Sequence, residues 1–190
     1  MMHRIEPNSP ELQEVLTALY EASFVPGTTL PHYRPDGMAD TWALDLRLGL
    51  SQHALLLPIA QAMGRLIRES GVTQIVGSGY GSAFLLGGLL ATVPDFRAGI
   101  IRDAAKPHGF RKLIEGSITT DQPVFLVDDI LSSGKSAADS LTVLQQQGFA
   151  VAGLATVFRY GWRNPEERLK EAQIPLYSLG TLSLAVTATQ

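Results

Sequence analysis

The stretch VFLVDDILSSGKS, residues 124–136, decides the fold of this 190-residue chain. Its first four residues are apolar, as expected for a strand that is buried on both faces of a parallel sheet. Two adjacent acids, Asp128 and Asp129, follow where that strand should end, and a short polar turn then leads into a helical pattern that reaches Gln147. Ligands of open α/β sheets bind outside the carboxyl ends of the strands. We therefore expect the acids and the turn to form a binding site.

The two halves of this stretch favour different parts of one ligand. Backbone N–H groups of a turn and a new helix point outward unpaired, which suits a phosphate. The residues that would form this phosphate site are Ser132, Ser133, Gly134, Lys135 and Ser136. Asp128 and Asp129 repel phosphate and are better suited to hydroxyl groups or a divalent cation. A ribose 5-phosphate satisfies both halves.

Two other interpretations of this stretch are possible. In the first, the acids and serines only end a strand and cap a helix. In the second, the sequence GKS at 134–136 is the end of a P-loop. That motif needs a glycine at position 129, where Asp129 stands, so the P-loop is excluded.

The composition excludes several classes of function. A length of 190 residues favours a single domain with a sizeable core. The net charge of −3 gives no nucleic-acid footprint, and the absence of cysteine excludes disulfides, thiolate metal sites and thiol nucleophiles. We see no signal peptide and no apolar run long enough to span a bilayer. We expect a cytoplasmic protein that binds neither nucleic acid nor a membrane.

Strands and helices alternate along most of the chain. The pattern predicts helices over residues 10–22, with Ser9 as N-cap, and over 51–70, 135–147 and 165–172, plus a glycine-rich helix that ends at 91. It predicts strands over residues 42–47, 73–76, 97–102, 124–127, 150–158 and 174–179, and loops over 24–37 and 103–118. Such alternation is typical of a central parallel sheet flanked by helices, an α/β fold.

A second turn, which is rich in glycine (GSGYGS, residues 77–82), also follows a predicted strand. Glycines there let the backbone approach an anion closely. A dinucleotide fingerprint is the alternative, but its third glycine arrives one position early. We therefore interpret residues 77–81 as an anion-binding loop.

The stretch 124–136 resembles the signature with which type I phosphoribosyltransferases bind 5-phosphoribosyl 1-pyrophosphate (PRPP). The resemblance implies that Asp128 and Asp129 hold the ribose hydroxyls and that the turn residues cradle the 5-phosphate. It further implies that Gly77, Ser78 and Gly79 contact the pyrophosphate. The fold implied is a type I phosphoribosyltransferase fold in one domain, with a core over residues 51–179 and a hood from residues 1–50 and 180–190.

Residues 102–109, RDAAKPHG, with IEG at 114–116, resemble the catalytic loop of orotate phosphoribosyltransferases, R-K-x-x-K-x-H-G. The resemblance implies catalytic roles for Arg102, Lys106 and His108, beside the acid pair. Asp103 replaces a basic residue of that pattern. Residues 36–47 resemble the N-terminal segment S-G-x-x-S-x-x-Y-x-D-x-R of the same enzymes. Gly37, Thr41, Asp45 and Arg47 fit that pattern, whereas Asp36 and Ala43 do not.

The predicted base site departs further from the orotate enzymes. They carry Asp-Arg where this chain has Phe158 and Arg159, and Lys-Ser-Gly where it has residues 35–37, PDG. Arg159 can pair with a carboxylate through two hydrogen bonds. Arg34 stands one position away from the matching lysine. Arg159, Phe158 and Arg34 are therefore the predicted base contacts, and the acceptor stays open between orotate, another pyrimidine and a purine.

The activity implied by the resemblance is Mg²⁺-dependent phosphoribosyl transfer from PRPP to a nucleobase, most closely orotate. The Mg²⁺ would be carried mainly by PRPP, so no metal site made by the protein alone is predicted. The resemblance also implies a homodimer in which the basic loop serves the neighbouring subunit. The rival is a PRPP-sensing regulator without catalysis, and the presence of Lys106 and His108 favours the enzyme.

Overall fold

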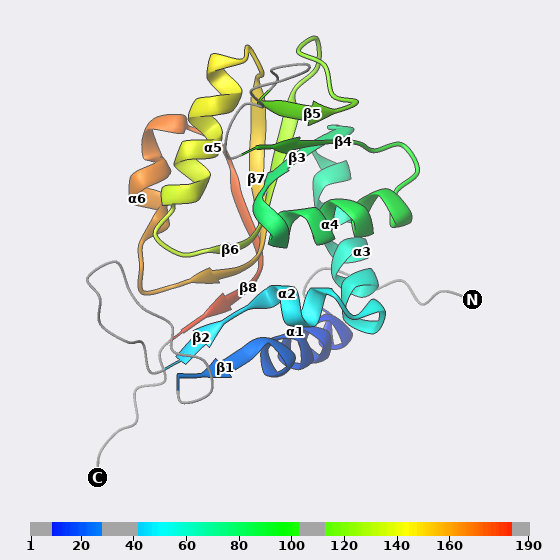
Figure 1. Ribbon diagram of the computed structural model, residues 1–190, viewed down its shortest axis with the longest axis vertical. Coiled ribbons are helices and arrows are strands. Elements are labelled where there is room, and N and C mark those ends of the chain that lie inside the picture. Colours follow the sequence, from blue (N-terminus) through cyan, green and yellow to red (C-terminus); the bar gives the residue numbers. More distant parts are fainter. Residues whose placement is uncertain (1–8, 28–41, 103–112, 184–190) are drawn as a thin grey trace.

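A computed structural model of the chain describes residues 9–27, 42–102 and 113–183 (Figure 1). Its main sheet has six strands in the order β5-β4-β3-β6-β7-β8. Every neighbouring pair is parallel except β4 and β5, which are antiparallel. The strands are β3 (Gln74–Ser78), β4 (Arg97–Ile101), β5 (Ile114–Gly116), β6 (Val124–Leu131), β7 (Val151–Tyr160) and β8 (Leu176–Leu182). The prediction of a mostly parallel α/β sheet is confirmed.

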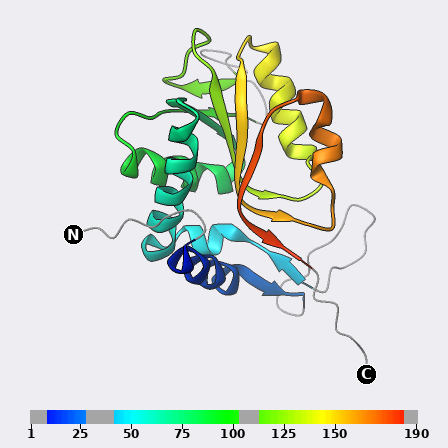
Figure 2. The same cartoon turned by 180° about the vertical axis from the view of Figure 1, so that it is seen from behind.

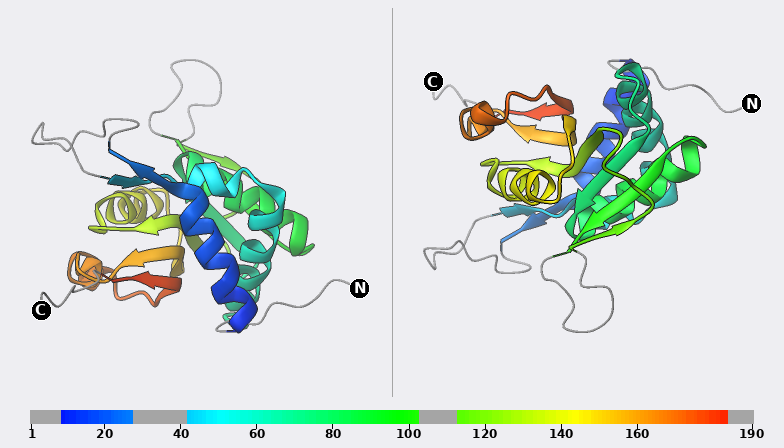
Figure 3. Two further views of the ribbon diagram at one scale, coloured as in Figure 1. Left: turned by 90° about the horizontal axis from the view of Figure 1, so that it is seen from below. Right: turned by 90° about the horizontal axis from the view of Figure 1, so that it is seen from above.

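Helices cover both faces of this sheet (Figure 3). One face carries α3 (His53–Glu69) and α4 (Gly79–Thr92), and the other carries α5 (Lys135–Gln146), α6 (Pro165–Leu169) and a 3₁₀ turn (Lys170–Ala172). Side chains of β6 alternate between two apolar clusters: Phe125 and Val127 pack with α3 and α4, whereas Val124 and Leu126 pack with α5. This burial on both faces explains why the strand is a continuous apolar run.

A smaller layer formed by the N-terminal elements lies across the end of the sheet to which β6 and β7 run (Figures 1 and 2). It consists of α1 (Pro10–Ser23), β1 (Phe24–Pro26), β2 (Trp42–Leu44) and α2 (Leu46–Leu50), with β1 and β2 antiparallel. We call this layer the hood. It comes from residues 1–50, the N-terminal part of the predicted hood, whereas residues 180–182, also assigned to the hood, are the last residues of β8 in the main sheet. Residues 1–8, 28–41 and 184–190 lie outside the described residues. The boundaries of a single domain stay a prediction.

The strand predicted over residues 42–47 is wrong in its second half. The chain leaves β2 at Asp45, whose carboxylate accepts the backbone N–H of Arg47 at 3.2 Å and caps α2. The Arg47 guanidinium also grips both oxygens of that carboxylate, at 2.6 and 2.8 Å. These bonds hold the pKa of Asp45 below its usual value. A helix cap therefore outweighs the alternating pattern.

Four other boundaries differ from prediction. The loop predicted over 103–118 contains β5, a strand too short to show a period, and the loop predicted over 24–37 begins with β1. Residues 77–81 are mostly not a loop, because β3 runs to Ser78 and α4 begins at Gly79. Strand β6 continues through the acids to Leu131, because its backbone stays paired with β7 as far as Arg159. Within the described ranges, no helix is long and apolar enough to cross a membrane.

The start of α1 gives a test of the fold. Ser9 caps this helix as predicted, with its Oγ accepting the N–H of Leu12 at 3.2 Å. Replacing Ser9→Ala leaves that N–H unsatisfied, and we expect urea denaturation to show a loss of about 1 kcal/mol in the free energy of unfolding. The control is Thr17→Ala in the same helix, because the Thr17 hydroxyl only donates to the carbonyl of Gln13. Equal losses in the two variants would refute the cap.

Candidate active site

The end of β6 presents two adjacent carboxylates that are largely withdrawn from water. Asp128 Oδ1 accepts hydrogen bonds from the backbone N–H of Asp129 at 2.9 Å and from Ser82 Oγ at 3.3 Å. Asp129 Oδ1 accepts the N–H of Ile130 at 2.8 Å. Each carboxylate thus folds back on the neighbouring backbone, and these bonds engage Oδ1 of each acid.

Burial and mutual repulsion set the charge of this acid pair. Burial, followed by the negative charge of Asp129, raises the pKa of Asp128 to about 7. Burial also raises the pKa of Asp129, and the positive charge of Arg47 in the hood acts in the opposite direction. With a pKa near neutrality, Asp128 is only partly ionised at pH 7. A ligand that brings hydroxyl donors or positive charge would relieve the repulsion between the two acids.

Glycine at the start of α4 makes room for the second acid. A Cβ at Gly81 would overlap Asp129 Oδ2, so a larger residue there would force that carboxylate to move. Gly79, with φ +75°, forms the sharp turn between β3 and α4, and Ser78 makes no side-chain cap to that helix. The first N–H groups of α4 therefore lie beside the acids without a capping side chain. That Gly77, Ser78 and Gly79 bind pyrophosphate stays a prediction.

The turn after β6 encloses a hollow of about 60 Å³. The hollow is lined by Asp128, Ile130, Leu131, Ser132, Ser133, Gly134, Lys135, Ser136 and Ala137. Gly134, with φ +75°, begins α5 and provides no side-chain cap, so N–H groups of the first turn remain available. The Lys135 ammonium is turned along the helix to Asp139, at 2.8 Å. The structure thus brings all five predicted phosphate-site residues together with one acid around a single hollow.

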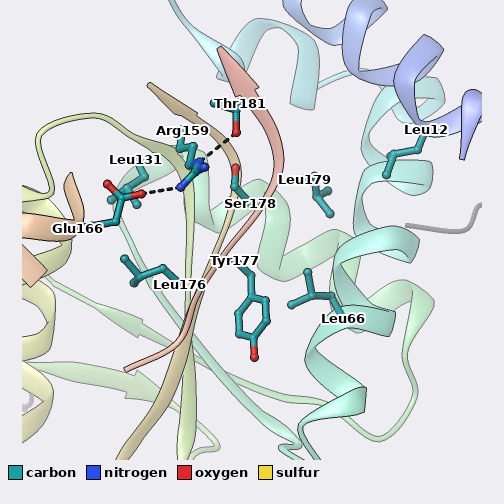
Figure 4. Close-up of a pocket in the computed structure, with 10 residues that line it drawn as sticks. All are labelled: Leu12, Leu66, Leu131, Arg159, Glu166, Leu176, Tyr177, Ser178, Leu179 and Thr181. Carbon is teal, nitrogen blue, oxygen red and sulfur yellow. Dashed lines mark hydrogen bonds and ion pairs between the residues drawn. The ribbon is translucent and has the colours of Figure 1, made fainter. Parts of the chain in front are cut away.

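The predicted base contacts have different surroundings. Arg159, at the end of β7, donates from Nε to Thr181 Oγ1 at 3.0 Å and from Nη1 to Glu166 Oε1 at 2.5 Å (Figure 4). It lines a hollow of about 360 Å³ that also includes Leu131 and Leu179. Phe158 is only 3% exposed and belongs to the apolar core. A Cβ at Gly180 would meet its ring at 2.8 Å, so the structure gives Phe158 a packing role.

The predicted catalytic loop is described only at its two ends. Arg102 follows β4 and forms an ion pair with Glu115 of β5 at 3.1 Å. Lys106 and His108, like Arg34 of the predicted base site, lie outside the described residues. Their catalytic and base-binding roles stay predictions. The position of Arg102 at the end of β4 places it two strands from the acids along the same edge of the sheet.

A row of stacked aromatic rings joins the hood to the end of β7. Tyr160 stacks on Trp162 with ring centroids 4.7 Å apart, and Trp42 of β2 meets Tyr160 edge-on at 6.3 Å. Trp42 in turn stacks on Phe24, which contacts Tyr20 of α1. Sequence reasoning missed this row because its members come from distant segments. It also missed Glu166, which belongs to no recognised motif.

The acids alone do not form a metal cage. Among the residues that the structure describes, no group of three or more His, Asp or Glu side chains could hold a metal ion. Mg²⁺ commonly binds through one or two carboxylates together with phosphate oxygens and water. Two adjacent carboxylates beside a phosphate-sized hollow fit a cation that arrives with a phosphate ligand.

Comparisons with known proteins point to one family, although no family model matches the chain. The chain is 31% identical to the orotate phosphoribosyltransferase of Bacillus cereus (strain G9842) over 148 residues, 77% of this chain and 70% of that enzyme. It is 38% identical to that of Cytophaga hutchinsonii over 79 residues, which are 42% of this chain and 38% of that enzyme. The match therefore spans less than half of the Cytophaga enzyme.

A solved structure supports the same relationship. The crystal structure of Mycobacterium tuberculosis H37Rv orotate phosphoribosyltransferase in complex with Fe(III) dicitrate superposes with a TM-score of 0.74. The two chains are 26% identical, and the superposition covers 91% of this chain and 97% of that enzyme.

The raised pKa of Asp128 predicts how stability depends on pH. The folded protein binds this proton more tightly than the unfolded chain, where the pKa is near 3.8. The free energy of unfolding should therefore fall as pH rises from about 4 to about 7. Asp128→Asn has no charge to bury, so we expect it to raise that free energy by about 2–4 kcal/mol at pH 8 and much less at pH 4.

The control for this prediction is Asp139→Asn, which removes an exposed acid from α5. Exposed ion pairs contribute little, so this variant should change stability by less than about 1 kcal/mol at either pH. Denaturation of both variants at the two pH values gives the comparison. A gain from Asp128→Asn that is the same at both pH values would show that the carboxylate is not under strain.

Proposed function

This chain belongs to the orotate phosphoribosyltransferase family, and we propose that it transfers the ribose 5-phosphate group of PRPP to a nitrogen of orotate. The products are orotidine 5'-monophosphate and pyrophosphate. The observation that carries the proposal is the half-buried acid pair beside the phosphate-sized hollow, at the carboxyl edge of the sheet. The match to the Bacillus cereus enzyme supports the choice of orotate among nucleobases.

The ribose 5-phosphate group fits the site in one direction. Its 5-phosphate would take the hollow of the β6–α5 turn, where the N–H groups at the start of α5 are available. Its 2- and 3-hydroxyls would donate to Asp128 and Asp129. Hydrogen bonds from hydroxyls favour the charged form of a carboxylate, so ligand binding would return the two acids toward their usual pKa values.

The charge that develops in the reaction gives the acids and the N–H groups of α4 different roles. As the bond between the anomeric carbon and pyrophosphate breaks, positive charge grows on the sugar and negative charge on pyrophosphate. The carboxylates of Asp128 and Asp129 would stabilise the first, and the start of α4, with Arg102 and Lys106, would stabilise the second. Groups that are already in place before the reaction stabilise such charge most effectively.

We propose that Mg²⁺ enters the site bound to PRPP. When bound, it would supply positive charge beside the departing pyrophosphate. Asp128 and Asp129 are the residues that would hold it. The cytoplasmic location expected from the sequence stays a prediction.

The acceptor would bind at the carboxyl end of β7. Arg159 follows Phe158 there and lies level with Leu131, the last residue of β6. We propose that its guanidinium binds the carboxylate of orotate, the group that distinguishes orotate from uracil. Phe158 would support Arg159 from within the core, and Arg34 would contact the base from the hood.

An assay with a panel of bases tests this function. Purified protein with PRPP and Mg²⁺ should release pyrophosphate with orotate, and much less with uracil or adenine. The Asp128→Asn/Asp129→Asn double variant should bind PRPP at least tenfold more weakly, because hydrogen bonds to charged groups are each worth about 1.5–3 kcal/mol. Unchanged PRPP affinity in the folded double variant would disprove the site. PRPP binding without turnover of any base would indicate the regulator instead.

We also propose that the protein is a homodimer. One side of α4 is apolar and open to solvent: Tyr80, Phe84 and Leu90 are 78%, 37% and 44% exposed. Their spacing places them along one stripe of the helix, with Ala83 and Gly87 between them. An exposed apolar stripe of this kind marks an interaction surface. A second copy that covers it by two-fold symmetry would bring the two active sites near one interface.

Complementation tests both the dimer and the shared loop. A Lys106→Ala chain and an Asp128→Asn/Asp129→Asn chain, each inactive alone, are mixed and allowed to exchange subunits. If Lys106 acts in the partner's site, each heterodimer contains one intact site, so activity should reappear. The control is each variant mixed with itself. Heterodimers without activity would place Lys106 in its own subunit's site, and a monomer in light scattering would disprove the dimer.

A further inference from the structure

We propose that Glu166 sets the acceptor specificity of this site by competing with the acceptor's carboxylate for Arg159. The inference rests on the proposed function, because it concerns the base end of the same site. The contact that suggests it is the ion pair between Arg159 Nη1 and Glu166 Oε1, at 2.5 Å. A carboxylate of the protein itself thus lies where the carboxylate of orotate would bind.

The hydrogen bonds of Arg159 leave no free edge for a second carboxylate. A guanidinium binds a carboxylate most strongly through two parallel N–H bonds along one edge. Arg159 already donates from Nε to Thr181 and from Nη1 to Glu166 (Figure 4). On the edge that contains Nε, one donor is already bonded to Thr181, and on the edge that contains Nη1, one donor is already bonded to Glu166. An incoming carboxylate that forms two bonds to the Nη1 edge must therefore displace Glu166.

Glu166 is held in this position by the helix that carries it. Pro165 and Leu169, which flank it on α6, are buried. Arg168 Nε of the same helix donates to the carbonyl of Ser133, in the turn between β6 and α5, at 3.1 Å. A Cβ at Gly134 would lie 3.1 Å from the carbonyl oxygen of Pro165. These contacts anchor α6 at several points, so the helix stays in place. Glu166 can leave Arg159 by rotating its side chain alone.

The pair is also weak enough to be exchanged. The side chains of Arg159 and Glu166 are 43% and 48% exposed, so water screens their attraction. A carboxylate that makes two bonds would replace the single bond that Arg159 makes to Glu166, whereas an uncharged base would leave the pair intact. Glu166 therefore weakens the binding of a ligand that carries a carboxylate by a modest factor, and it leaves the binding of uncharged bases unaffected.

The test compares Glu166→Gln with Glu167→Gln. Both variants remove one negative charge from the same helix, but Glu166 is the residue paired with Arg159. We expect Glu166→Gln to lower the KM for orotate about two- to fivefold, the range for a half-exposed ion pair, with kcat nearly unchanged. Glu167→Gln should leave the KM unchanged, and competition by uracil should be the same in all three proteins.

A double-mutant cycle shows whether the effect passes through Arg159. In an Arg159→Ala background, Glu166→Gln should no longer change the KM for orotate. A higher KM in Glu166→Gln would mean that Glu166 positions Arg159 for the substrate, which overturns the proposal. An unchanged KM, an equal effect of Glu167→Gln, or a persistent effect without Arg159 would also overturn it. Failure of the proposed function is distinct, because it appears as absence of orotidine 5'-monophosphate with the unmodified protein.

Discussion

The partial burial of two neighbouring carboxylates at the end of β6 is the constraint on which the rest of the site depends. The strand that delivers them is apolar on both faces and is packed between two helical layers. That packing fixes the backbone at the edge of the sheet and also removes the acids from water, which raises the pKa of Asp128 to about 7. The unliganded site is therefore electrostatically unfavourable, and a ligand that brings donors or positive charge gains by relieving it.

The elements around the acids are shaped by this requirement. The first turn of α4 contains Gly81, which has no side chain, at the point where Asp129 approaches, and the same helix places Ser82 beside Asp128. The hood contributes Arg47, whose charge favours the ionised form of Asp129. Helix α6 supports the turn between β6 and α5 through the hydrogen bond from Arg168 to Ser133. Three segments far apart in the sequence thus adjust one pair of charges and the hollow next to them.

Residues whose role depends on their neighbours in the chain could be predicted from the sequence. The apolar run at 124–127, the cap at Ser9 and the helix after Gly134 were all found, because strand period and capping are local. The strand β5, the turn at Asp45 and the partner of Arg159 were not found. Strand β5 is too short to show a period, and Asp45 caps a helix although it continues an alternating pattern. Glu166 meets Arg159 because α6 packs on the turn between β6 and α5.

The row of aromatic rings between the hood and β7 has a consequence for the optical properties of the protein. The chain has two tryptophans, Trp42 and Trp162, and both stand in this row, on either side of Tyr160. The indole emission of the native protein therefore arises entirely at the junction between hood and sheet. The two tryptophans thus form an intrinsic fluorophore pair whose signal reports on the distance between the hood and the main sheet. The acids and the turn between β6 and α5 contain no tryptophan and do not contribute to this emission.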